Sequence, residues 1–252
     1  METEKENENI ATDCLLKEGV KLAKAGKHEK AIECFDTVLT LRPYYAKAFS
    51  HKAISLLELK RFEDAITLYD KMISLSLCLV EAWRSKGQVF CVLGRHEEAI
   101  EFYDKAISLK LGFFKALMNK GKAFSQLKRF QEALECYDQC LSLKPGNTEA
   151  NILKANSLNQ LERHQEAIQV MKKALRIDPR NSLLHCYLAG TFDEIGDNKE
   201  TFEHFRFGKF FLRDSKNFLD QREIGLVERF FEIIPETEIL LEKSYKNFPN
   251  LM

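Results

Sequence analysis

The sequence predicts an all-α fold of stacked helical hairpins, and a fixed period is the main observation behind this prediction. Gly and Pro are scarce, with 11 and 5 in 252 residues, which favours long helices over strands. Five alanines stand 34 residues apart, each followed four places later by an aromatic residue or Met: Ala31 and Phe35, Ala65 and Tyr69, Ala99 and Tyr103, Ala133 and Tyr137, Ala167 and Met171. Such a period is typical of arrays of supersecondary units, which bind other chains more often than they catalyse reactions.

Each 34-residue block predicts two helices joined by a short turn. In block 80–113, Trp83, Gly87 and Phe90 stand at helical spacing, and Gly94 then interrupts the pattern. The second helix has its apolar residues on one stripe: Ala99, Ile100, Tyr103, Ala106 and Ile107. The block therefore predicts an αα-hairpin.

Small residues recur at one place on each first helix and predict close helix crossings. They are Gly19, Ala53, Gly87, Gly121, Ala155 and Ala189. A small residue lets two helices approach, and a large residue of the partner helix fills the notch. We expect Phe35, Tyr69, Tyr103 and Tyr137 to be those large residues. Prolines at 43, 145 and 179 follow second helices, where proline ends a helix.

This pattern resembles the tetratricopeptide repeat family. The family order of Trp, Leu-Gly, Tyr, Ala, Phe and Pro is met by Trp83, Gly87, Phe90, Ala99 and Tyr103. It recurs in two further sets: Leu15, Gly19, Leu22, Ala31, Phe35, Pro43, and Leu117, Gly121, Phe124, Ala133, Tyr137, Pro145. The resemblance covers residues 12–215 and implies a right-handed α-solenoid superhelix. The 34-residue period argues against the related 35-residue RNA-reading repeats.

The period divides the chain into blocks. We expect a disordered acidic lead at 1–11, repeats at 12–45, 46–79, 80–113, 114–147 and 148–181, a degenerate repeat at 182–215, and a Phe-rich helical cap at 216–252. The sixth block departs from the pattern, with Thr201 at the alanine place, Gly208 at a later small place and Arg213 at the proline place. A terminal repeat exposes an apolar face, so residues 216–247 are interpreted as its cap. The alternative is a hydrophobic docking or self-association surface.

Charge and cysteine usage favour a cytoplasmic protein. Formal net charge is zero, which points to neither nucleic acid nor membrane as a partner. Residues 15–181 hold 28 basic against 20 acidic residues, a net of +8, between acidic ends. No apolar run reaches the length of a membrane span. The acidic N-terminus lacks the apolar region of a signal peptide, and the seven cysteines show no disulfide or zinc spacing.

The sequence predicts neither a catalytic site nor a bound metal or cofactor. It contains no Gly-rich phosphate loop, HExxH, GxSxG or CxxC motif. His28, His96 and His164 share one repeat place, at the start of the second helix, and are interpreted as packing residues. Cys136 and Cys140 are interpreted as small core residues, and the pair His185 and Cys186 lacks a third group to orient it.

The resemblance also implies a binding face, because the family usually binds extended peptides along the concave face formed by its first helices. The candidates on these helices are Lys17, Lys24, Lys47, His51, Arg84, Gln88, Lys115, Asn119, Lys122 and Asn156. Glu58, Glu81 and Glu149 interrupt them. Lysines and amides can hold carboxylates and peptide backbone.

The family's dicarboxylate clamp for chaperone tails is incomplete in this chain. Arg84, Gln88 and Asn119 supply the first two helices, but Glu149 and Leu153 stand where two cations are required. We therefore expect a non-catalytic adaptor that binds a protein or peptide partner in its groove. The alternative is a structural subunit that assembles a larger complex or homodimer through its Phe-rich C-terminal end.

Overall fold

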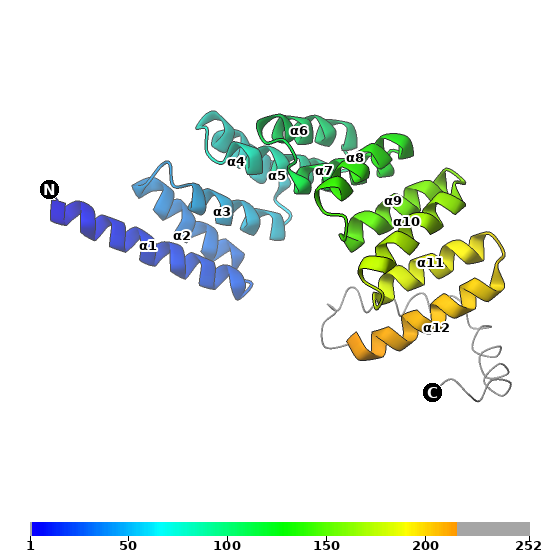
Figure 1. Ribbon diagram of the computed structural model, residues 1–252. Helices are drawn as coiled ribbons and strands as arrows, with labels where there is room; N and C mark the ends of the chain where they lie inside the picture. The colour runs from blue at the N-terminus through cyan, green and yellow to red at the C-terminus, as the bar shows by residue number, and fades with distance from the viewer. Residues whose placement is uncertain (1, 216–252) are drawn as a thin grey trace. The chain divides into compact units, whose positions relative to one another are not determined.

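A computed structural model of the protein describes residues 2–215, which form twelve α-helices (Figure 1). They are α1 (Glu2–Lys24), α2 (His28–Leu41), α3 (Ala46–Glu58), α4 (Phe62–Ser74), α5 (Leu79–Val92), α6 (His96–Leu109), α7 (Phe114–Gln126), α8 (Phe130–Leu143), α9 (Thr148–Gln160), α10 (His164–Ile177), α11 (Ser182–Glu194) and α12 (Asn198–Ser215). These residues contain no strand, which confirms the all-α solenoid fold.

The helix bounds keep the period of the sequence. The second helices α2, α4, α6, α8 and α10 begin at positions 28, 62, 96, 130 and 164, which are 34 residues apart. A residue with positive φ precedes each second helix, at Gly26, Gly94 and Gly196 but also at Lys60, Lys128 and Glu162. Since a side chain disfavours this conformation, helix packing rather than glycine fixes these turns.

The chain divides into two compact units, residues 1–127 and 128–252. In unit 1, each helix from α1 to α7 packs on the next, and the first helices α1 and α3, and α5 and α7, also touch. In unit 2, α8 to α12 pack in the same consecutive way, and α9 touches α11. Each helix therefore depends mainly on its neighbours in sequence, as expected of a repeat array.

Glycine notches hold the hairpins of unit 1 together. A Cβ atom on Gly87 would lie 2.8 Å from Cε1 of Tyr103 and 3.0 Å from the carbonyl oxygen of Ala99. A Cβ atom on Gly19 would lie 2.6 Å from Cε1 of Phe35. Phe35 and Tyr103 are almost completely buried. The predicted pairing of a small residue with a large aromatic is therefore confirmed for these two hairpins.

Block 182–215 forms a helix pair although its sequence departs from the repeat. Thr201, at the alanine place, is buried in α12 and donates its hydroxyl to the Asp197 carbonyl at 2.8 Å. A Cβ atom on Gly208 would lie 2.7 Å from Sγ of Cys186, so α12 approaches α11 closely at this later glycine. The close crossing is thus retained, with its position shifted along the helix.

One boundary differs from the sequence expectation. Helix α1 begins at Glu2, so the acidic residues expected to form a disordered lead over 1–11 are helical in the structure. Glutamate is a good helix former, and the segment continues a helix that the first repeat already requires. The predicted cap at 216–252 lies outside the described residues, and the block boundaries remain our proposed division.

Two histidines with little exposure join α12 to α11. Nδ1 of His185 lies 2.9 Å from Nδ1 of His204, and Nε2 of His185 lies 3.1 Å from the Pro179 carbonyl oxygen. A carbonyl only accepts hydrogen bonds, so Nε2 of His185 donates, and Nδ1 of the neutral ring accepts from His204. Phe192 stacks on His204 at 5.6 Å. This contact is therefore made between neutral rings.

The histidine contact predicts acid sensitivity of unit 2. Burial, with the nearby His185 and Lys172, lowers the pKa of His204 to about 4, and burial also lowers the pKa of His185. These effects outweigh Glu200, whose carboxylate lies 3.7 Å from His204. Between the unfolded histidine pKa of about 6.5 and the folded pKa, the unfolded chain binds more protons. Stability should therefore fall as pH is lowered from 7 to 5.

Urea denaturation of the wild type and His204→Gln at both pH values checks this prediction. The variant should lose less free energy of unfolding on acidification, because its side chain does not titrate. An equal loss in both proteins would contradict it.

The glycine notch predicts the effect of overpacking. Gly87→Leu should lower the free energy of unfolding by about 1–3 kcal/mol, because the new side chain meets both Tyr103 and the α6 backbone. Val92→Leu, at an exposed position on the same helix, is the matched control and should change stability little. An unchanged thermal midpoint for Gly87→Leu would show that the crossing is not tightly packed.

Candidate functional site

Four ion pairs connect second helices to the first helices that follow them. Nζ of Lys52, Lys86, Lys120 and Lys154 lies 2.5 Å from Oδ1 of Asp36, Asp70, Asp104 and Asp138, respectively. The lysine side chains are 11–22% exposed, whereas the aspartates are about half exposed. These lysines are therefore occupied by acidic partners within the fold.

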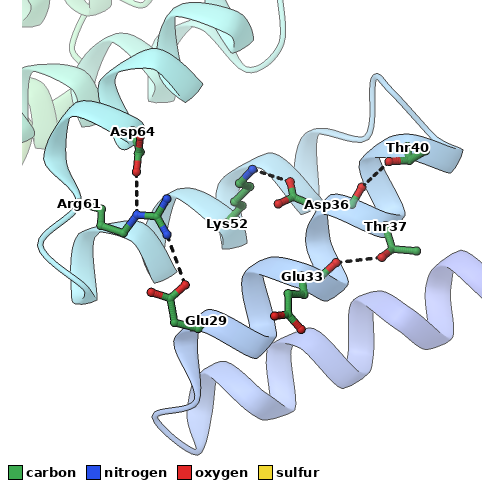
Figure 2. A network of polar contacts seen from close by, with 8 residues as sticks. All are labelled: Glu29, Glu33, Asp36, Thr37, Thr40, Lys52, Arg61 and Asp64. Carbon is green, nitrogen blue, oxygen red and sulfur yellow. Dashed lines mark hydrogen bonds and ion pairs between the residues drawn. The ribbon is translucent and has the colours of Figure 1, made fainter.

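A row of arginines before the second helices is paired in the same way. Arg61, Arg95, Arg129 and Arg163 each form an ion pair with an acidic residue three places later. Arg61 also reaches Glu29 of α2 at 3.3 Å, as Figure 2 shows together with the pair of Lys52 and Asp36. Such exposed pairs contribute little to stability, because solvent screens them. Their main consequence is that the charges of these four arginines are compensated within the fold.

The predicted binding residues of unit 1 lie on the first helices α1, α3, α5 and α7. Their side chains recur at helical spacing, as Lys17 and Lys24 do on α1 and Lys47 and His51 on α3. We call this surface the first-helix face; its members are Lys17, Lys24, Lys47, His51, Arg84, Gln88, Lys115, Asn119 and Lys122. Lys17, Lys24, Lys47, Gln88 and Lys115 are exposed, and the other four are half-buried.

Five of the six lysines and arginines of the first-helix face differ from the paired rows in their partners. Within the described part of the chain, no carboxylate forms an ion pair with Lys17, Lys24, Lys47, Arg84 or Lys115. The acidic residues Glu58 and Glu81 on the same helices are likewise outside any such pair. This face therefore presents positive charge that the fold leaves uncompensated.

Polar contacts hold Arg84 in place. Its Nη1 donates to Oε1 of Gln88 at 3.0 Å and its Nη2 to Oγ of Ser85 at 2.9 Å. Nε of Arg84 is buried without a hydrogen-bond partner among the described residues. Both partners are neutral, so they orient the guanidinium without cancelling its charge.

Two buried tyrosines extend this network to the neighbouring helices. Tyr69 of α4 is hydrogen-bonded to Ser85, and burial raises its pKa. The Tyr103 hydroxyl lies 3.4 Å from Sγ of Cys91 and is hydrogen-bonded to Asn119 of α7; burial raises its pKa as well. Arg84 is thus connected through Ser85 to α4, and Asn119 through Tyr103 to α6.

The remaining candidates are placed differently. Asn156 lies half-buried on α9 of unit 2 and therefore does not belong to the first-helix face of unit 1. Cys136 and Cys140 are buried in α8. Cys186 is fully buried, and burial raises the pKa of its thiol to about 12, so it is unsuited to act as a nucleophile at neutral pH.

The histidines at the start of second helices are half-buried, as packing residues would be. Nδ1 of both His28 and His96 is buried without a partner among the described residues, whereas Nδ1 of His164 lies 3.4 Å from Oδ1 of Asn159. Because the same atom is unpartnered in two equivalent places, we interpret it as a property of the repeat position and not as a sign of a ligand.

No helix among residues 2–215 combines the length and apolar character that crossing a membrane requires. In the same residues, no three His, Cys, Asp or Glu side chains converge to form a metal site.

Many solved structures have similar folds, and three of them illustrate how little sequence identity accompanies the likeness. PilW, a type IV pilus biogenesis factor, is 17% identical, with a TM-score of 0.66 over 86% of this chain and 98% of its own. MamA from Desulfovibrio magneticus RS-1 is 22% identical, with a TM-score of 0.59, and the likeness covers 67% of this chain and 96% of MamA. YrrB, described as a TPR protein with an unusual peptide-binding site, is 18% identical, with a TM-score of 0.54 over 68% and 88%.

Comparison with curated proteins gives no match. Family models described as tetratricopeptide repeat match residues 16–76, 81–112, 114–147 and 148–181. These matches span most of the described helices, and the structural neighbours have the same fold. The chain therefore belongs to the tetratricopeptide repeat family, whose members typically serve as protein-interaction scaffolds.

Proposed function

We propose that this protein is a non-catalytic adaptor that binds an acidic, extended segment of a partner protein on the first-helix face of unit 1. A cytoplasmic setting is part of the proposal, since all seven cysteines are free thiols, as expected in a reducing compartment.

The observation that carries this proposal is the difference in charge pairing between two sets of cations on the first helices. Lys52, Lys86 and Lys120 are paired with aspartates of the preceding second helices, whereas Lys47, Arg84 and Lys115 have no acidic partner in the described structure. Charges that the fold does not pair can be neutralised by a ligand. Carboxylates of a partner would supply that neutralisation and would also be steered towards the face.

The polar residues beside Arg84 suit an extended ligand. A guanidinium can donate two parallel hydrogen bonds to one carboxylate, and Arg84 is already oriented by Ser85 and Gln88. Gln88 and Asn119 carry amides that can donate to and accept from a peptide backbone. Binding of this kind requires an acidic chain without demanding one particular sequence.

The structural relatives support the class of function. YrrB is described by its peptide-binding site and PilW by its part in pilus biogenesis. Both have the same fold as this chain, and we extend to it only the general property of binding another protein.

Assembly through the C-terminal end is the alternative function. Phe210 on α12 is 60% exposed, and Phe207 on the same helix is also exposed. An apolar patch of this kind favours protein contact. Sedimentation of the full chain over a range of concentrations separates the two functions, because a monomer at all concentrations argues against self-assembly.

Charge reversal tests the proposed function. Arg84→Glu with Lys122→Glu should weaken binding of short Asp- and Glu-rich peptides by about tenfold or more, because both substitutions place negative charge on the proposed binding face. Added salt should weaken binding to the wild type, since it screens the same attraction. Fluorescence anisotropy with labelled peptides measures both effects.

The matched control reverses two exposed lysines outside this face, Lys30 and Lys60, and produces the same change in net charge. It should retain most of the binding. Equal losses in both double variants would show that net charge alone attracts the peptides, and the first-helix face would then have no special part in binding.

A further inference from the structure

A concavity of about 440 Å³ lies on the first-helix face at the end formed by α1 and α3. Its lining residues are Val20, Ala23, Lys24, Gly26, His28, His51, Ile54 and Glu58. On α1, Lys17, Val20 and Lys24 share one stripe, and on α3, Lys47, His51, Ile54 and Glu58 share another. The concavity is therefore continuous with the surface that carries the unpaired cations.

The wall of this concavity is mainly apolar. Ile54 is 53% exposed although it is a large aliphatic residue, and Val20 and Ala23 face it from α1. The His51 ring stacks on Phe35 at 5.8 Å. Burial, and then Lys47, lowers the pKa of His51, so the ring is neutral at pH 7. The concavity thus presents an aliphatic and aromatic lining to solvent, which suits a large apolar side chain.

The charged residues around the concavity determine which ligand residues can lie next to that apolar side chain. Lys24 and Glu58 stand at the edge, and neither is ion-paired within the described residues. Lys17 and Lys47 lie one helical turn from Val20 and His51, towards the helix N-termini. Three cations against one acid favour carboxylates next to the apolar side chain.

A second cavity, in unit 2, does not have these properties. It has a volume of about 240 Å³ and is lined by charged residues that include Lys154, Arg163, Asp138 and Glu166. These four are paired with one another as Lys154 with Asp138 and Arg163 with Glu166. Its lining is therefore charged and largely ion-paired, unlike the apolar wall between α1 and α3.

We propose that the concavity between α1 and α3 takes one large apolar side chain, such as Leu, from the acidic segment that the first-helix face binds. The inference rests on the proposed function and makes it more specific, because it defines the partner as an acidic segment with an apolar anchor residue. Burial of the anchor contributes affinity that charge alone does not supply.

Paired peptides test this assignment with the full chain. A panel of short Asp- and Glu-rich peptides is made in which each position in turn carries Leu or Ser, and binding is measured by fluorescence anisotropy. At one or two positions, Leu should bind about tenfold tighter than Ser, as expected for burial of an aliphatic side chain.

Substitutions locate the effect. Ile54→Ser should abolish the preference for Leu, whereas Val92→Ser should retain it; Val92 is the matched control because it is also an exposed aliphatic residue of a first helix but does not line the concavity. Ala23→Gln fills the concavity from α1 and should have the same effect as Ile54→Ser. Circular dichroism checks that each variant is folded.

The outcomes separate the two proposals. Tight binding with no preference for Leu at any position overturns the anchor site and leaves the proposed function intact. A Leu preference that survives in folded Ile54→Ser or Ala23→Gln places the anchor elsewhere and overturns the assignment. If no acidic peptide binds, both proposals fail. The chain without peptide is also tested for self-association. If it self-associates and Ile54→Ser abolishes this, a second copy of the chain occupies the concavity, and the assignment to a partner's side chain is overturned.

Discussion

Close contact between a small residue on one helix and an aromatic ring on the next is the constraint on which the described hairpins depend. Gly87 leaves no room for a Cβ atom beside Tyr103, and Gly19 leaves none beside Phe35. This contact fixes which side of each first helix is buried, because the notch must face the second helix. The residues beside the buried side, including Arg84 next to the Gly87 notch and Lys115 on α7, are then placed on the first helices by helical geometry. Packing thus determines where the proposed binding face lies, without any contribution from the proposed binding residues themselves.

Charge pairing gives neighbouring cations of the same first helix different properties. Lys86 lies against Asp70 and close to the rings of Phe90 and Phe102, so its charge is used within the fold. Arg84, two residues earlier on the same helix, is directed by Ser85 and Gln88 and has no acidic partner among the described residues. Such a contrast between near neighbours is difficult to explain by composition, because both residues are cations on one helix. It follows from the acidic positions, which recur on the second helices. The unpaired cations and the adjoining concavity together define a surface suited to an acidic segment with one apolar side chain.

The sequence predicted the helix pairs and the glycine notches because both follow from apolar periodicity, as Gly87 and Tyr103 illustrate. That Arg84 and Asn119 share a face stays a prediction, which rests on their equivalent helical spacing on α5 and α7. The ion pairs of Lys52, Lys86, Lys120 and Lys154 were missed, although these lysines and their aspartates keep the 34-residue period; their separation of 16 residues becomes meaningful only once the stacking of hairpins is known. The concavity beside Ile54 could not be predicted, because its volume depends on how α1 and α3 pack. The structure begins α1 at Glu2, within the segment expected to be a disordered lead, since charge composition alone does not separate a helix from a disordered segment; the division of the chain stays a prediction.

Zero-length crosslinking with a carbodiimide tests the central claim most directly, because it joins a partner's carboxylates only to lysine amines that they contact. The full chain and a bound Asp- and Glu-rich peptide are crosslinked, and the modified lysines are identified by mass spectrometry. Our account predicts crosslinks at Lys47 and Lys115, which are exposed and unpaired on the first-helix face. It predicts few at Lys30, Lys71 and Lys105, which are equally exposed on second helices. Crosslinks concentrated on these second-helix lysines would contradict the account.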